Sequence, residues 1–450
     1  MTRSSHPVGP PTPTRPQLRS TAARRLAGLA GLAVVLAGSA GVAGATEPPP
    51  TEPPPTEPAV SEAPVSEPPS SAVPTAGSGG RSPDTGANPP GCVEDADGGD
   101  LFTDQFTVRH AENYTLSYAA TYKVLTVGEI GPGAGEQTYV LVQCGTEAPA
   151  LEGDLADASV VEIPVATMFS ESTSHNGFID VLDLESTLTG VGDESWIVTP
   201  SLRQRIDAGA VESFNTTGAI DTEAVVAADP DVYVTGGYDD PSHEALREAG
   251  IPVVANAEWL ENTPPGWAEW VGVFAALTNT EARATELYDG WIADYETAAA
   301  LVTEVTEQPT VLTGGLYEGT WYASGGDSVA AQFIADAGGD YLYDDNTDTG
   351  STELDIETVL ADAAEAEVWL LASPFTTEAE AEASDERNEE FDAWDDGGVW
   401  ITSVPPDPTV SPIESGPVRI DDYLLDYIAI LHPELVPDHE LVFFSEVPES

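Results

Sequence analysis

The sequence predicts an α/β fold with two lobes, each built on a parallel, helix-covered sheet, joined by a single long interlobe helix. Strand-like and helix-like segments alternate in residues 158–257 and again in residues 308–403. One helical stretch, residues 261–305, separates these two halves. The chain from residue 91 onward has about 360 residues, which exceeds one ordinary hydrophobic core and favours two lobes.

The N-terminus carries a predicted export signal. Arg24 and Arg25 precede an apolar run of small residues that ends in Ala43-Gly44-Ala45, a small-x-small cleavage pattern. A retained membrane anchor is the alternative, because an apolar run of roughly 20 residues can also span a bilayer. No cysteine follows the run, so no lipobox anchor is expected. We therefore predict that residues 1–45 export an extracellular protein, either secreted or associated with the cell surface, by the general or the twin-arginine route.

Residues 46–95 are predicted to form a disordered linker rich in Pro, Glu and Thr. They contain almost no large apolar side chain, and their negative charge favours an extended chain. Such a linker can pass through a cell wall, or it can be only a spacer or a glycosylated stalk.

The composition is strongly acidic. The first 45 residues hold five of the 14 Lys and Arg residues and none of the 78 Asp and Glu residues, so nine basic side chains remain after them. Such a surface repels nucleic acid and anionic membranes, and no nucleic-acid partner is expected.

Two cysteines, Cys92 and Cys144, are the only ones in the sequence. In an exported protein a single pair most simply forms one disulfide, which would tie the start of the fold to the end of the strand at residues 137–144. A redox or metal role is the alternative, but the sequence has no C-x-x-C pattern and no nearby histidine cluster.

The first half begins with β structure. Residues 114–130 and 137–144 alternate β-branched and aromatic residues and predict an antiparallel pair of strands. The next segments are predicted as a strand, a helix, a helix with a strand, a helix closed by Gly250, and a strand, at residues 158–165, 175–187, 221–237, 242–250 and 251–257. This order indicates a parallel sheet.

The middle stretch predicts two helices. Pro264 and Pro265 begin the first, in which apolar residues at helical spacing form one stripe against the first lobe: Trp267, Trp270, Val271, Phe274 and Leu277. Thr278 and Glu281 have capping-box spacing for a second helix over residues 280–305, whose length of roughly 38 Å would join two lobes. Most of these aromatic residues are therefore interpreted as core.

The second half repeats the pattern. It is predicted as a strand and loop, a helix and strand, a second helix and strand, and a final strand, at residues 308–323, 327–343, 355–373 and 397–403.

These segments resemble a known family. "VVAADPDVYVTGG", "AGIPVVANAEWLENTPPGWAEWVGVFAALTNTEARATELYDGWIADY", "PTVLTGGLYEGTWYASGGDSVAAQFIADAGGDYLY" and "IESGPVRIDDYLLDYIAILHPELVPDHEL" resemble the helical-backbone (class III) substrate-binding proteins of ABC importers, in their iron-complex and cobalamin branch. The resemblance begins near residue 110 and implies a ligand cleft between two lobes that close little. It implies an N-terminal lobe at 96–279, an interlobe helix at 280–305 and a C-terminal lobe at 306–450. Two features depart from the family: the missing lipobox cysteine, which members in Gram-positive organisms usually carry, and Trp267 in "PPGWAEW", where members with this motif often have arginine.

An enzyme is not favoured by the motifs. The histidines beyond the signal segment are scattered, without an H-E-x-x-H or H-x-H pattern, at His110, His175, His243, His432 and His439. No G-x-S-x-G motif is present. We expect no catalytic residues, no cofactor and no resident metal.

Candidate ligand contacts lie in loops that follow strands, where open α/β sheets bind ligands. Ser172, Thr173 and His175 stand at a predicted helix start, where helix capping is the alternative role. Trp196 follows the second strand, with core packing as its alternative. Trp321 and Tyr322 form the predicted aromatic platform of the second lobe. Arg419 either contacts an anionic ligand group or pairs with Glu414, and the pair is favoured.

An aromatic, histidine-poor cleft suits an organic or chelated complex better than a bare metal ion. A ferric siderophore is therefore expected, followed by cobalamin or a related corrinoid and by haem. The resemblance also implies ABC permease subunits as partners, met by surface acids for which Asp239, Asp240 and Asp327 are the candidates; helix capping is their alternative role. We expect a monomeric receptor, and the alternative is a non-transport surface scaffold or adhesin.

Overall fold

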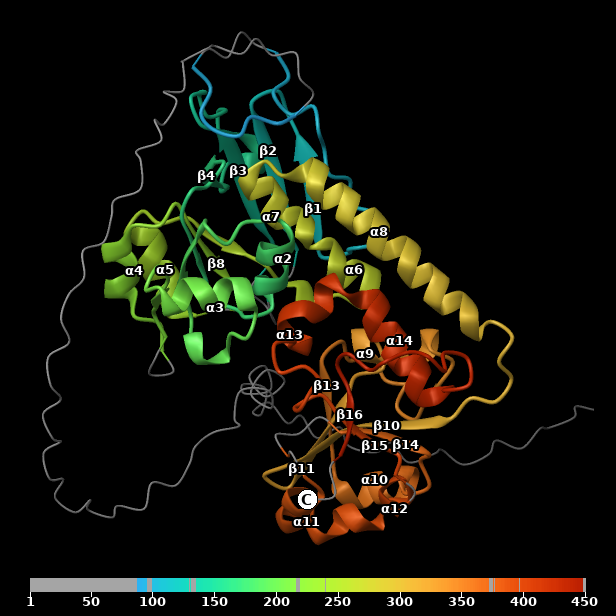
Figure 1. Cartoon of the computed structure of the whole chain (residues 1–450). Helices are drawn as coiled ribbons and strands as arrows, with labels where there is room; N and C mark the ends of the chain where they lie inside the picture. Colours follow the sequence, from blue (N-terminus) through green and yellow to red (C-terminus); the bar gives the residue numbers. More distant parts are fainter. Residues whose placement is uncertain are drawn as a thin grey trace, which may run out of the picture.

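The described residues form three β-sheets, and one long helix leads from the first two to the third. The computed structural model describes residues 87–94, 99–128, 130, 135–215, 219–238, 240–371, 375, 377–395 and 397–447 (Figure 1). The predicted export signal and most of the predicted linker lie outside these residues. Among the residues that the structure describes, no helix is both long and apolar enough to cross a membrane.

A four-stranded sheet follows the N-terminal segment. Its strands lie in the order β1-β2-β3-β4, with bounds Tyr114–Tyr118, Tyr122–Val127, Gln137–Gln143 and Ser159–Ile163. The pairs β1–β2 and β2–β3 are antiparallel, whereas β3 and β4 are parallel. The predicted antiparallel pair is thus present, but its first member is a hairpin of two strands. The predicted strand at 158–165 belongs to this sheet and not to the parallel sheet of the first lobe.

The first lobe contains a fully parallel five-stranded sheet. Its order is β7-β6-β5-β8-β9, with bounds Glu212–Ser213, Leu188–Val191, Met168–Ser170, Val232–Thr235 and Val253–Ala255. Its helices are α2, α3, α4 and α5, at His175–Val181, Pro200–Asp207, Thr222–Ala228 and Pro241–Glu248. Gly250, with φ of 95°, ends α5 as predicted. Strands β5 and β7 and helix α3 were not predicted from the sequence, whereas the strand expected before Trp196 is β6.

The helical connection consists of α6, α7 and α8, at Pro264–Glu269, Val271–Thr278 and Glu281–Ala299. Trp270, Val271, Phe274 and Leu277 are fully buried in the largest core, as the stripe predicts. Trp267 instead packs edge-on against Tyr423 of the C-terminal part, with ring centroids 6.5 Å apart. Helix α8 has 19 residues, or about 28 Å at 1.5 Å per residue, and runs from the first sheets toward the second lobe (Figure 1).

The second lobe contains a mixed sheet in the order β13-β11-β10-β14-β15-β16, with β12 paired to β10. Strands β10 to β16 have the bounds Thr310–Tyr317, Thr320–Ser324, Asp340–Tyr341, Ser351–Leu354, Val368–Leu371, Val399–Ile401 and Ser445–Glu446. Helices α9 to α14 have the bounds Val329–Asp336, Ile356–Ala363, Glu378–Ser384, Asp392–Asp395, Pro412–Ser415 and Ile420–Leu431. The predicted strand and helix order of this half is therefore confirmed, and its parallel strands are β10, β12, β14 and β15.

Short 3-10 helices complete the described fold. They are η1 to η6, at Gly153–Leu155, Glu194–Trp196, Glu258–Leu260, Ala300–Val302, Glu386–Glu390 and Gly416–Val418.

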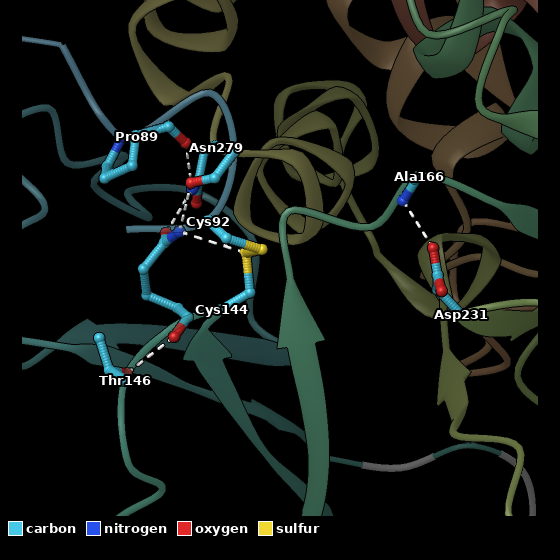
Figure 2. The surroundings of a disulfide bond; sticks show 9 residues. Pro89, Cys92, Cys144, Thr146, Ala166, Asp231 and Asn279 are labelled. Atoms are coloured by element: carbon cyan, nitrogen blue, oxygen red, sulfur yellow. Dashed lines mark hydrogen bonds between the residues drawn. A yellow bond between two sulfur atoms is a disulfide. The ribbon is translucent and has the colours of Figure 1, made fainter. Parts of the chain in front are cut away.

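The N-terminal segment is attached by a disulfide to the end of β3 and by hydrogen bonds to the helical connection. Cys92 and Cys144 form the predicted disulfide (Figure 2). The Asn279 side chain donates to the carbonyl of Pro89, 2.7 Å away. Asn88, which the sequence assigned to the linker, is 6% exposed and donates to the Glu281 carboxylate at 2.7 Å. The folded region thus begins inside the predicted linker.

Glu281 does not form the predicted capping box. The N-cap of α8 is Thr280, and the hydroxyl of Thr278 donates to the carbonyl of Phe274. The Glu281 carboxylate is instead fully buried and forms an ion pair with Lys123, the single lysine in the sequence. A buried partner from β2, distant in the sequence, thus replaces the local backbone partner that the spacing suggested.

Candidate functional site

The candidate site lies where the two lobes meet. In the first-lobe sheet the chain leaves β5 toward β6 on one side and returns as β8 on the other, so the loop after β5 begins at a topological switch point. Ligands of open α/β sheets bind in the crevice at such a point. The loops after β5 and β6 lead into α2 and η2, and α2 contacts α13 and η6 from the C-terminal part.

A groove of about 410 Å³ opens at this boundary. We call it the interlobe groove, and it is lined by Val198, Pro200, Arg203, Gln204, Asp207 and Thr409. The first five belong to α3 or precede it, and Thr409 belongs to the loop after β15. Within the groove Arg203 donates to Asp207 from both Nε and a terminal nitrogen, at 3.1 and 3.0 Å. The wall contributed by the first lobe therefore combines apolar surface with a charge-compensated guanidinium.

Two exposed apolar residues lie close in sequence to residues that line or support the interlobe groove, although neither is part of its lining. Trp196, in η2, is 39% exposed and lies two residues before Val198. Ile413, in α13, is also 39% exposed, and it precedes Glu414, whose carboxylate contacts the Val198 backbone. Small-molecule sites are lined mainly by apolar and aromatic side chains. A larger groove of about 540 Å³ follows residues 105–118 and contains none of the predicted site residues.

The side chain of Glu414, in the C-terminal part, contacts the first lobe. Its carboxylate is 1% exposed and accepts hydrogen bonds from the backbone N–H of Val198 and Thr199, at 2.7 and 2.9 Å, and from the Thr199 hydroxyl. Burial raises the pKa of Glu414, although these hydrogen bonds act in the opposite direction. Sequence reasoning did not identify Glu414 as an interlobe contact, and among 78 acidic residues no sequence signal distinguishes it.

A second buried carboxylate supports the loop after β5. Glu258, in η3, is 2% exposed and accepts hydrogen bonds from the Ser174 hydroxyl and from the Asn256 amide, the latter at 2.6 Å. Burial raises the pKa of Glu258 to about 7, against the effect of the Ser174 hydrogen bond. This carboxylate fixes the residue that precedes α2, and it too was missed in the sequence.

The residues predicted at the start of α2 separate into two groups. Ser172 and Thr173 are partly exposed, and the Ser172 hydroxyl lies 2.8 Å from that of Ser174. His175 is fully buried; its Nδ1 lies 2.8 Å from the Ser170 hydroxyl, and its ring packs against Phe274. Burial lowers the pKa of His175 to about 3, so the imidazole is neutral. The ligand contact predicted for His175 is therefore wrong, because its side chain is part of the core.

The aromatic platform predicted at Trp321 and Tyr322 in the second lobe is not formed as expected. Trp321 is fully buried, stacks on Trp369 with ring centroids 5.4 Å apart, and donates its Nε1–H to the carbonyl of Thr313. No ligand can reach that ring without displacing the core. Tyr322, on the other face of β11, is only partly buried.

Arg419 has a different partner from the one predicted. Its Nε donates to Asp422 at 2.7 Å, and its guanidinium lies 5.5 Å from the centre of the Phe443 ring. It is therefore paired with Asp422 and not with Glu414, whose acceptor atoms are used by Val198 and Thr199.

Of the predicted docking acids, Asp239 lies outside the described residues. Asp240 is the N-cap of α5 and accepts a hydrogen bond from the Ser242 N–H at 2.7 Å. Asp327 is exposed and precedes Ser328, which is the N-cap of α9. The capping role is thus present at Asp240 and absent at Asp327.

Within the described part of the chain, no group of three His, Cys, Asp or Glu residues is arranged to hold a metal ion.

Comparisons with known proteins agree with this architecture. Residues 172–394 match the family model described as periplasmic binding protein. An uncharacterized lipoprotein of Methanocaldococcus jannaschii is 25% identical over 296 residues, which span 63% of this chain and 69% of that protein. The CeuE protein of Helicobacter pylori has a similar structure, solved with Ni(II) and as a Ni–His complex. These two structures have TM-scores of 0.50, identities of 15% and 14%, and cover 70% of this chain and 91% and 90% of theirs.

Proposed function

Because the chain belongs to the periplasmic binding protein family, as a helical-backbone solute-binding protein, we propose that it captures a ferric siderophore in the interlobe groove and delivers it to an ABC permease. Proteins of this family are extracellular or periplasmic receptors that bind solutes for ABC permeases, and they are not enzymes. The observation that carries the proposal is the groove between the lobes, with exposed Trp196 two residues before Val198 in its lining.

The size and lining of the groove favour a compact organic complex. A volume of about 410 Å³ falls in the range of roughly 300–1,000 Å³ typical of small-molecule sites. Val198, Pro200 and the neighbouring Trp196 offer apolar surface to an organic chelator. The alternatives are a corrinoid and haem, which are organic metal complexes as well. A non-transport surface scaffold remains the alternative of another class.

We also propose that residues 1–45 export the protein and that residues 46–86 keep the receptor at or near the cell surface. The M. jannaschii relative is named a lipoprotein, whereas Cys92 and Cys144 of this chain are bonded to each other and neither is free for acylation.

Replacing Trp196 with alanine should weaken binding of a ferric trihydroxamate by about 1–3 kcal/mol, as expected for an aromatic side chain that anchors a ligand. Binding is measured by calorimetry with the ferric complex, with cyanocobalamin and with haemin. Val226→Ala, at an equally exposed apolar residue on α4, is the control and should change nothing. Unchanged affinity in a folded Trp196→Ala protein would place the ligand elsewhere. Binding of cyanocobalamin alone would reject the siderophore and support the corrinoid.

Docking on the permease is proposed to involve Asp240 and Asp327, one in each lobe. The double variant Asp240→Lys with Asp327→Lys should abolish uptake and leave ligand affinity in solution nearly unchanged, because charge complementarity orients partners. Asp240→Asn with Asp327→Asn is the matched variant, since asparagine keeps the helix cap at residue 240 and removes both charges. Normal uptake by the lysine variant would show that these acids do not contact the permease.

A further inference from the structure

A short segment of the C-terminal part is inserted against the first lobe. We call residues 411–418 the wedge segment; it contains α13 and η6. A Cβ atom at Gly177 of α2 would lie 2.2 Å from the carbonyl oxygen of Glu414, and one at Gly416 would lie 2.8 Å from the Trp267 ring. The wedge segment therefore approaches α2 so closely that the backbone contact at Gly177 requires glycine, and it also packs tightly against the Trp267 ring.

The wedge segment is linked to both walls of the interlobe groove, to one through the chain and to the other through hydrogen bonds. Two residues before it, Thr409 lines the groove from the second lobe. Within it, the Glu414 carboxylate binds the backbone of Val198 and Thr199, on the opposite wall. One side chain thus connects the two walls, at a point two residues beyond Trp196.

We infer that Glu414 is a positioning residue for ligand recognition, which holds the loop carrying Trp196 and sets the spacing of the two groove walls. The inference rests on the proposed function and adds to it the residue that orients the binding surface. Every acceptor atom of this carboxylate faces a donor: one oxygen receives the Val198 N–H, and the other receives the N–H and hydroxyl of Thr199. Removing the carboxylate leaves these donors unpaired in a buried place, so the loop is expected to shift toward solvent.

The inference is tested first without ligand, by hydrogen exchange of the Val198 and Thr199 amides in the full chain. In Glu414→Ala both amides should exchange at least about tenfold faster, because their hydrogen bonds to a charged group are lost. Glu434→Gln, at an exposed acid of the same lobe, is the control. Thr199→Val, which lacks the hydroxyl donor, should show part of the effect, and Thr199→Ser should restore wild-type exchange. Unchanged exchange in Glu414→Ala overturns the inference.

A second measurement follows Trp196 itself. The emission of Trp196 is obtained as the difference between each protein and its Trp196→Phe derivative, and its quenching by acrylamide should increase in Glu414→Ala and not in Glu434→Gln. An unchanged Trp196 signal would mean that Glu414 has only a general structural role.

The third measurement uses the ferric trihydroxamate as probe. Affinity should fall about tenfold in Glu414→Ala, as expected when an orienting contact is lost. Affinity should also be lower in Thr199→Val, and in Thr199→Ser it should be close to that of the wild type. A displaced Trp196 with unchanged affinity overturns the positioning role. If the wild-type protein binds neither the trihydroxamate, cyanocobalamin nor haemin, the proposed function fails, while exchange and quenching still decide whether Glu414 holds the loop.

Discussion

Replacing Glu269 with alanine is expected to lower the free energy of unfolding by about 3–5 kcal/mol. The Glu269 carboxylate is fully buried and accepts hydrogen bonds from three consecutive backbone N–H groups, those of Arg109, His110 and Ala111, at 2.8, 2.6 and 2.7 Å. Glutamine cannot replace it, because either carboxylate position taken by an amide nitrogen would face a backbone donor. Alanine leaves all three donors without their acceptor.

Denaturant unfolding of Glu269→Ala, Glu269→Gln and wild type measures this loss. Glu286→Ala, at an exposed residue of α8, removes the same charge and should change stability by less than about 0.5 kcal/mol. Hydrogen exchange of residues 109–113 separates global unfolding from detachment of this segment alone. A loss below about 1 kcal/mol without faster exchange there would show that the contact contributes little.

Replacing Lys123 with methionine is expected to cost a similar amount, about 3–5 kcal/mol. The Lys123 ammonium is fully buried, bonds the Ala276 carbonyl at 2.8 Å and the Asn279 side chain at 2.7 Å, and forms an ion pair with Glu281. Burial lowers the pKa of Lys123, and the Glu281 carboxylate opposes that shift. Methionine fills much of the volume but leaves a buried carboxylate without its counter-charge.

A double-mutant cycle tests whether the unpaired charge causes the loss. Lys123→Met with Glu281→Leu should be less destabilised than the sum of the two single variants, because no isolated buried charge remains. Arg283→Ala, which breaks the exposed pair of Arg283 with Glu286, is the control and should change stability by less than about 1 kcal/mol. Strict additivity of the two single effects would contradict this interpretation.

Two buried carboxylates, those of Glu261 and Glu269, lie in the tryptophan-containing stretch at residues 261–270. Its tryptophans were expected in the core, and Trp270 is indeed fully buried. Its acids were not noticed. Glu261 accepts hydrogen bonds from the backbone N–H of Glu112 and from Trp270 Nε1, at 2.9 and 2.8 Å, beside the contacts of Glu269. The motif therefore builds the core and also attaches the segment before β1 to the helical connection.

The candidate site was predicted less well than the fold. Trp196 and Trp321 both follow strand-like stretches and were both expected at the cleft. Trp196 is 39% exposed, whereas Trp321 is fully buried between β10 and β13 neighbours and under Phe391. Sequence alternation says that neighbouring residues on a strand face opposite sides, but it does not say which side another element will cover.

The sequence by itself determined the two α/β halves, the long connecting helix, the buried stripe of α7 and the disulfide between Cys92 and Cys144. These features depend on local periodicity, turn residues and a single possible cysteine pair, which the linear pattern carries. Only the tertiary structure decided which acids are structural. Glu414 binds residues 215 and 216 positions earlier, and Glu269 binds backbone groups up to 160 positions earlier. The sequence has 78 acidic residues, and which of them become buried and paired is decided only when distant segments pack together. The reason is that a buried carboxylate needs hydrogen-bond partners that can come from anywhere in the chain, so its position follows no periodic sequence pattern.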